Sequence, residues 1–232
     1  MNQFVEAFGW LLESEHWTGP DGIPTRLLEH LWYSGAALAF AAALAVPVGL
    51  IVGHARSRRA ELVAVQVANA GRAVPTLAVL AIVYALTLQL APELAFGFVP
   101  TVVALVLLGL PPILLNTTIG VRSVDADLQE SARGMGMRGR QLLRWVEVPL
   151  AAPLIVTGLR IAALQIVATA TLAAFIGGGG LGRYIRDGFS QQDRPMMIAG
   201  AYLVAALALL TEGLFAVLTR ATAPGGSDPR RR

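Results

Sequence analysis

The sequence contains no cysteine and no lysine. Without cysteine, the chain can form no disulfide bond and offers no thiolate for catalysis or metal binding. Without lysine, it cannot supply the residue that reaches the phosphates in a nucleotide-binding P-loop. The glycine run at 177–182 is accordingly not followed by Lys-Ser or Lys-Thr, and the chain has no P-loop of its own.

Charged residues are also scarce. They make up 14% of the 232 residues, against roughly 25% in soluble globular domains, whereas 55% of the residues are hydrophobic. Several uncharged runs exceed the roughly 20 residues that a helix needs to cross a bilayer. We therefore predict an all-α, polytopic membrane protein. The net charge of +3, supplied by arginine alone, indicates an orientation in the membrane and no binding of nucleic acid.

Predominantly apolar runs predict about five membrane-spanning helices. Their expected ranges are 31–53, 61–92, 98–121, 148–176 and 196–219. We expect the second run to be one long helix that kinks at Pro75, because proline removes a backbone hydrogen bond and clashes with the preceding turn. Two shorter helices in this run are the alternative, and they would bring the total to six.

The segments that flank the predicted transmembrane region 31–219 are polar. Residues 1–30 are predicted to be extracytoplasmic and are too acidic at their start for a cleaved signal peptide. Apolar residues at positions 4, 5, 8, 11 and 12 predict a short helix on the membrane surface, with an unstructured tail as the alternative. We expect 177–195 to be an outer loop whose glycines form a flexible exit from the membrane, and 220–232 to be disordered.

Arginine placement predicts the orientation of the chain, since Lys and Arg are retained on the cytoplasmic side. Five of the 18 arginines lie between positions 122 and 144, which places the loop 122–149 in the cytoplasm. In this topology twelve arginines fall on cytoplasmic segments and four on outer ones. The N-terminus is then expected outside and the C-terminus in the cytoplasm.

The loop 122–149 carries a spaced motif. Its candidate functional residues are Glu130, Ser131, Ala132, Gly134, Gly136, Val146, Val148 and Pro149. The pattern resembles the EAA loop of ATP-binding-cassette importer permeases, which reads Glu-Ala-Ala, three residues, Gly, nine residues, Ile-x-Leu-Pro. Serine at the second position and valine for both Ile and Leu are the departures. We expect a short helix, a turn at Gly136 that suits only glycine, and a second helix; the alternative is an ordinary solvated loop.

Three further stretches, 111–125, 132–137 and 170–182, look like the osmoprotectant branch of these permeases, which imports glycine betaine, choline and carnitine. The resemblance implies a type I importer-like permease fold in the cell membrane of a prokaryote. It also implies three protein partners: an ATPase subunit that binds ATP and Mg²⁺, a second permease copy or homologue, and an extracytoplasmic substrate-binding protein. Membrane lipid would surround the chain, which needs no cofactor itself. A related importer of an amino acid such as methionine is the alternative.

A membrane-embedded enzyme and a passive channel are two other classes of function. A membrane-embedded enzyme would need paired acids, Ser with His, or a zinc-binding His pair facing the bundle interior. We expect Glu212 to be the only carboxylate deep in a helix and no histidine to lie in one, and the three scattered histidines suggest no metal site. A passive channel would need no ATPase-coupling loop.

Three charges are predicted inside the membrane: Arg72, Arg160 and Glu212. Charges there are costly and indicate function by default. Counted from the cytoplasmic helix ends they lie at similar depths, so we expect Glu212 to pair with Arg160 or Arg72 across neighbouring helices. The alternative is that each side chain reaches interfacial water separately.

Overall fold

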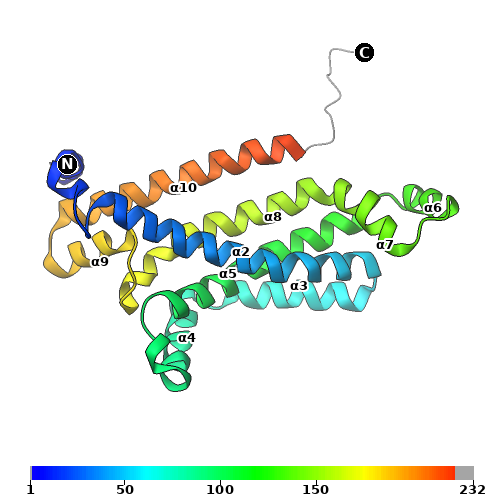
Figure 1. The fold of residues 1–232 in the computed structure, drawn as a ribbon, viewed down its shortest axis with the longest axis horizontal. Coiled ribbons are helices and arrows are strands. Elements are labelled where there is room, and N and C mark those ends of the chain that lie inside the picture. The colour runs from blue at the N-terminus through cyan, green and yellow to red at the C-terminus, as the bar shows by residue number, and fades with distance from the viewer. Residues whose placement is uncertain (1, 223–232) are drawn as a thin grey trace, which may run out of the picture.

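The computed structural model describes residues 2–222, apart from the side chains of Asn2, Arg72, Ala73 and Ala221. Regular structure in this part of the chain is entirely helical (Figure 1). The α-helices are α1 (Asn2–Leu12), α2 (Ile23–Ala55), α3 (Arg58–Ala73), α4 (Thr76–Leu90), α5 (Phe98–Arg122), α6 (Ala126–Gly134), α7 (Gly139–Leu142), α8 (Val148–Thr169), α9 (Gly182–Gln191) and α10 (Arg194–Thr222). The shorter turns are η1 (Ser14–Trp17), η2 (Pro92–Leu94), the π-helical η3 (Leu143–Glu147) and η4 (Ala170–Ile176).

Four helical stretches are long and apolar enough to cross a membrane: α2, α5, α10, and the continuous stretch Gly139–Ile176 that contains α8. A fifth crossing is formed if α3 and α4 count together, with a bend of 91° between them. The single kinked helix expected over 61–92 is therefore corrected to two helices. Val74 is extended, with φ −81° and ψ 126°, because the ring of a following proline disfavours the helical conformation of the residue before it.

Small side chains let the central helices α2, α5 and α8 approach closely. On α2 a small buried residue recurs at every fourth position: Ala37, Ala41, Ala45, Gly49 and Gly53. A Cβ at Gly49 would lie 2.7 Å from Thr117 Cβ on α5, so no larger residue fits there without a shift. Small interface residues of this kind are typical of helix packing in membranes, where close contact replaces the hydrophobic effect as the driving force.

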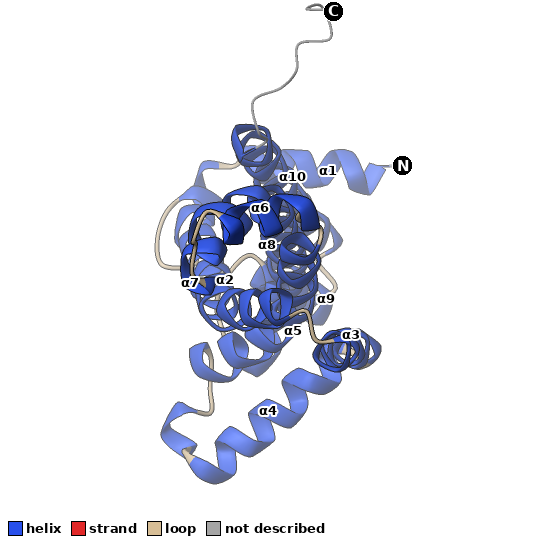
Figure 2. Cartoon of the chain, turned by 90° about the vertical axis from the view of Figure 1, so that its right-hand side faces the viewer, coloured by secondary structure: helices blue, strands red, loops and turns tan. Residues whose placement is uncertain are grey.

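The two ends of the bundle differ in structure. α6 and α7 lie at one end of the long axis, whereas α1 and α9 lie at the other (Figure 1). Seen along the bundle, α1 runs crosswise to the long helices and packs on α10 (Figure 2). The expected outer loop 177–195 contains the helix α9, which packs against α10. The predicted disordered tail lies outside the described residues from position 223 onwards.

The histidine expectation is wrong in one respect, since His30 and His54 both lie in α2. His30 is fully buried, and its Nε2 lies 2.9 Å from the carbonyl oxygen of Val167 on α8. This contact ties α2 to α8 near the α9 end. His30 therefore has a packing role, and no carboxylate lies within hydrogen-bond distance of it among the described residues.

Candidate functional site

The segment between α5 and α8 forms a helix, a glycine turn and a second helix. α6 follows Asp125, whose side chain accepts a hydrogen bond from the Asp127 backbone N–H at 2.8 Å, as an N-cap residue does. α7 follows Arg138, whose backbone N–H donates to Gln141 Oε1 at 2.8 Å. The sequence predicted this order of elements. We call residues 123–147 the α6–α7 loop.

Gly136 lies between the two helices with φ of +89°, a conformation that non-glycine residues rarely adopt. A Cβ at this position would meet no other atom within 4 Å. A side chain at Gly136 is therefore disfavoured by backbone conformation and not by a clash. Gly134 has the same open surroundings but no positive φ, because it still belongs to α6.

The remaining motif residues divide between the two sides of the loop. Ala132 is buried together with Gln129 and Leu142, so it anchors α6 inward. The residues at the other motif positions are Glu130, Ser131 and Pro149, which are exposed, and Val146 and Val148, which are half-buried. The motif thus fixes the shape of the loop and leaves one side of the loop exposed to solvent.

The outer side of the α6–α7 loop carries large apolar and basic side chains. Leu128, Met135 and Trp145 are 46%, 74% and 62% exposed. The exposed arginines of the loop are Arg133, Arg138, Arg140 and Arg144. Exposed apolar residues in a water-facing segment mark contact surfaces, and Trp and Arg are frequent energetic centres of protein interfaces.

The α2–α3 turn supports the base of the loop. Arg56, which has φ of +48°, donates from Nη2 to the carbonyl oxygen of Val124 at 2.9 Å. Arg122 Nη2, at the end of α5, lies 2.9 Å from Glu61 Oε2 on α3. At the end of the loop, Glu147 is fully buried and its Oε2 lies 2.6 Å from His54 Nδ1.

Sequence reasoning missed the pair His54–Glu147. Glu147 occupies the variable position between Val146 and Val148, and the motif assigns no role to that position. The sequence did contain one signal: Glu147 lies next to the apolar run of α8. A carboxylate at such a position requires a partner if it is buried.

The structure brings together two of the three predicted intramembrane charges. Arg160 Nε on α8 donates to Glu212 Oε2 on α10 at 2.8 Å, and Arg160 Nη2 contacts Glu212 Oε1. This two-point geometry is the strong form of an arginine–carboxylate pair. Both side chains are about one-third exposed, 33% and 34%. The side chain of Arg72 lies outside the described residues.

The glycine run after η4 is not the flexible exit that we expected. Gly180 N–H donates to Glu29 Oε2 at 2.7 Å, and Gly179 N–H donates to Tyr33 Oη at 3.3 Å. A Cβ on Gly179 would overlap the Glu29 carboxylate, so the run forms a fitted cradle for two side chains of α2. Gly180 also requires glycine because its φ is +86°.

α9 is fixed to the same end of α2. Tyr184 Oη donates to the carbonyl oxygen of Asp21 at 2.6 Å. Burial raises the pKa of the Tyr184 hydroxyl to about 12, so it stays protonated and able to donate at physiological pH.

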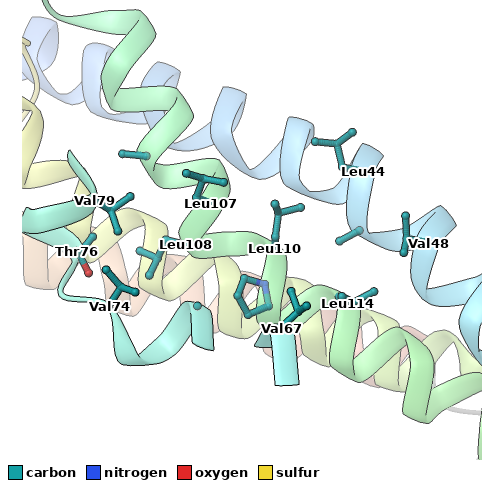
Figure 3. Close-up of a pocket in the computed structure, with 14 residues that line it drawn as sticks. Leu44, Val48, Val67, Val74, Thr76, Val79, Leu107, Leu108, Leu110 and Leu114 are labelled. Atoms are coloured by element: carbon teal, nitrogen blue, oxygen red, sulfur yellow. The ribbon is translucent and has the colours of Figure 1, made fainter. Parts of the chain in front are cut away.

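An apolar groove of about 490 Å³ lies between α2, α3, α4 and α5 (Figure 3). Leu44 and Val48 face it from α2, and Leu107, Leu110 and Leu114 face it from α5. Thr76 contributes the one polar side chain among the described lining residues. The described lining is therefore almost entirely apolar, and the groove suits apolar contacts.

One group of side chains has the spacing of a metal site. Ligand atoms of Glu13, Glu15 and His16 lie within 4.8 Å of one another. The two carboxylates are exposed, and His16 Nδ1 lies 2.8 Å from the Trp10 carbonyl oxygen. Exposed acidic groups of this kind are common on protein surfaces, and we assign no metal to them.

Comparison with known proteins gives a consistent result. The family model described as "Binding-protein-dependent transport system inner membrane component" matches residues 45–224. The glycine betaine/carnitine/choline transport system permease protein OpuCB of Bacillus subtilis (strain 168) is 38% identical over 198 residues, covering 85% of this chain and 87% of that protein. The carnitine transport permease protein OpuCB of Listeria monocytogenes is 40% identical, covering 79% and 80%.

Solved structures resemble this chain more closely in fold than in sequence. A structure of the MetNI methionine ABC transporter has a TM-score of 0.75 at 20% sequence identity, covering 87% of this chain and 96% of that one. An amino acid ABC transporter with histidines has a TM-score of 0.67 at 22% identity, covering 86% and 93%. At these identities the likeness concerns the fold alone.

Proposed function

This chain belongs to the inner membrane components of binding-protein-dependent transport systems, and we propose on that premise that it is the permease subunit of an ATP-driven osmoprotectant importer. The relationship to permeases named for glycine betaine, carnitine and choline transport carries the substrate class. Those relatives are 37–40% identical over most of this chain. The likeness to the methionine transporter supports only the fold, because its identity is 20%.

The proposed importer needs three further proteins. ATP and Mg²⁺ would bind a separate ATPase, because a chain without lysine cannot form a P-loop. An extracytoplasmic binding protein would deliver the substrate, in keeping with the family description. A second permease copy or homologue would complete the pathway, since a bundle of about five helices encloses little space and a two-fold interface is the usual solution.

The α6–α7 loop is the proposed contact with the ATPase. Its outer side combines exposed Leu128, Met135 and Trp145 with several arginines, and such side chains suit a protein surface more than bulk water. Movement of the ATPase would then shift the helices that flank the loop as rigid bodies. In this arrangement the α6–α7 end is cytoplasmic and α1 lies at the outer membrane surface, which agrees with the distribution of arginines.

The pair Arg160–Glu212 has a proposed role in helix packing. It joins α8, which follows the α6–α7 loop, to α10. An ion pair at this position would fix the relative position of the two helices in at least one state of the transport cycle, because breaking it would leave both charges in an environment of low polarity.

Uptake of labelled glycine betaine, choline and methionine tests the proposed substrate class. Cells that lack their own osmoprotectant importers would carry this permease with its partner subunits. We expect uptake of one or more quaternary ammonium compounds and no uptake of methionine. Uptake of methionine alone would refute the osmoprotectant assignment while leaving the importer assignment intact.

A further inference from the structure

Glu147 is the buried carboxylate that ends the α6–α7 loop. Its side chain is 0% exposed, although it lies only two residues after the exposed Trp145. The π-helical turn η3 leads into this position and ends there. π-helical turns are rare and occur frequently at functional sites. A buried carboxylate is costly unless it is paired and hydrogen-bonded, so its retention requires an explanation.

His54 is the side chain that bonds Glu147. Its Nδ1 lies 2.6 Å from Glu147 Oε2, and the two residues are 93 positions apart along the chain. Glu147 Oε1 has no hydrogen-bond partner among the described residues. A buried carboxylate with a hydrogen bond to only one of its oxygens adds little to stability. An apolar residue of similar volume would pack there without the cost of removing a charge from water.

The other side of the His54 ring faces α7. A Cβ at Gly139, the first residue of α7, would lie 3.3 Å from His54 Nε2. The imidazole therefore lies between the start of α7 and the carboxylate at the start of α8. The same end of α2 is packed closely on α5, since a Cβ at Gly53 would lie 2.7 Å from Val121 Cβ. His54 thus connects the α6–α7 loop to the central helices.

We infer that His54 and Glu147 are positioning residues that transmit movement of the α6–α7 loop to α2. The inference rests on the proposed function, because it assumes that an ATPase moves this loop. A displacement of α7 or η3 must either carry the His54 ring with it or break its bond to Glu147. While the bond holds, α2 follows the α7 side of the loop. Without it, α2 keeps its bond from Arg56 to the Val124 carbonyl oxygen at the α6 side, and the α7 side can move while α2 stays.

The test measures uptake of labelled carnitine and ATP hydrolysis together, in proteoliposomes that contain the permease, its ATPase and its binding protein. In His54→Ala we expect ATP hydrolysis to continue while uptake per ATP falls about tenfold, the factor expected from one hydrogen bond to a charged group. His54→Asn places an amide nitrogen close to the position of Nδ1 and should restore most of the ratio. His54→Gln places its nitrogen nearer to Nε2 and should not. His16→Ala, at the other end of the molecule, is the matched control and should leave the ratio unchanged.

The outcomes separate three cases. An unchanged ratio in His54→Ala overturns the inference, because a merely structural residue would lower uptake and hydrolysis together. If His54→Ala does not accumulate in the membrane, the comparison of His54→Asn with His54→Gln decides: a higher ratio in the asparagine variant supports the inference, and equal ratios overturn it. Absence of ATP-driven uptake in the unsubstituted complex would refute the proposed function instead.

Discussion

Gly136 sets the direction in which the chain leaves α6 and enters α7. Its φ of +89° is the feature that a side chain opposes, since the space around it is open. The left-handed conformation costs an ordinary L-residue about 1–2 kcal/mol, and asparagine adopts it more readily than alanine or a β-branched residue. The loss of function on replacing Gly136 should therefore follow the backbone preference of the new residue and not its side-chain volume.

We predict a graded loss across Gly136→Asn, Gly136→Ala and Gly136→Val. Valine should abolish uptake and weaken co-purification of the ATPase, and asparagine should have the smallest effect. Membrane insertion should stay normal in all three variants, because the loop lies outside the spanning helices. The amount of ATPase recovered with the tagged permease measures the effect. Full transport by the valine variant would remove the loop from the mechanism.

Gly179 is constrained by a neighbour and not by its own φ. We predict that Gly179→Ala destabilises the protein, because the added methyl group would overlap the Glu29 carboxylate. Glu29 can turn its flexible end away, so the cost is that of its displaced hydrogen bond to Gly180, about 1 kcal/mol, which should appear as a lower midpoint of thermal unfolding in detergent.

Gly35→Ala is the matched control for that experiment, because a Cβ at Gly35 on α2 would meet nothing within 4 Å. Its thermal midpoint should equal or slightly exceed that of the unsubstituted protein, since alanine favours a helix more than glycine does. Equal midpoints for the two single variants would show that the cradle around Glu29 is not close-packed in solution.

The helices themselves are the features that the sequence predicts best. The length of the predominantly apolar runs identifies the spans, and Pro75 marks the break between α3 and α4. The helix–turn–helix of the α6–α7 loop follows from the position of Gly136. The pairing of elements is not predictable in the same way, because it depends on residues distant along the chain. Glu147 meets His54 across 93 positions, and Gly180 meets Glu29 across 151.

The partners of polar side chains inside helices are equally hard to predict from the sequence. Their depth could be counted from the helix ends, which led to a pairing of Glu212 with Arg160 or Arg72. Counting could not distinguish the two arginines, since that choice depends on which helix packs beside α10. In the structure α10 packs on α8, and Glu212 contacts Arg160 there.

The pair Arg160–Glu212 gives a prediction for the packing of α8 on α10. Glu212→Gln should reduce stability or transport, because it leaves the Arg160 guanidinium without a charged partner. The loss should be well below the about 3–5 kcal/mol of a fully buried pair, since both side chains are about one-third exposed. Thermal unfolding and uptake in membranes measure it.

The double variant Arg160→Gln with Glu212→Gln should partly recover the loss, because it removes both charges together. If both single variants and the double variant behave like the unsubstituted protein, each charge is solvated separately. That result would refute the packing role proposed for the pair.

The described part of the chain presents apolar surfaces in three places. α10 exposes large apolar side chains in its C-terminal half, including Leu209, Leu210 and Leu214. The α6–α7 loop exposes apolar and basic residues at one end of the bundle, and an apolar groove opens between α2 and α5. Lipid suits the first of these surfaces, and protein partners suit the second.

We propose that this chain carries solute only when an ATPase drives it. The most direct test is uptake of labelled carnitine by proteoliposomes from which one component at a time is omitted: permease, ATPase, binding protein or ATP. We predict uptake in the complete system and background levels in every omission. Uptake with the permease alone would show a passive channel, and ATP hydrolysis by the permease alone would show that the energy source is not a partner. Either result would show that the proposed function is wrong.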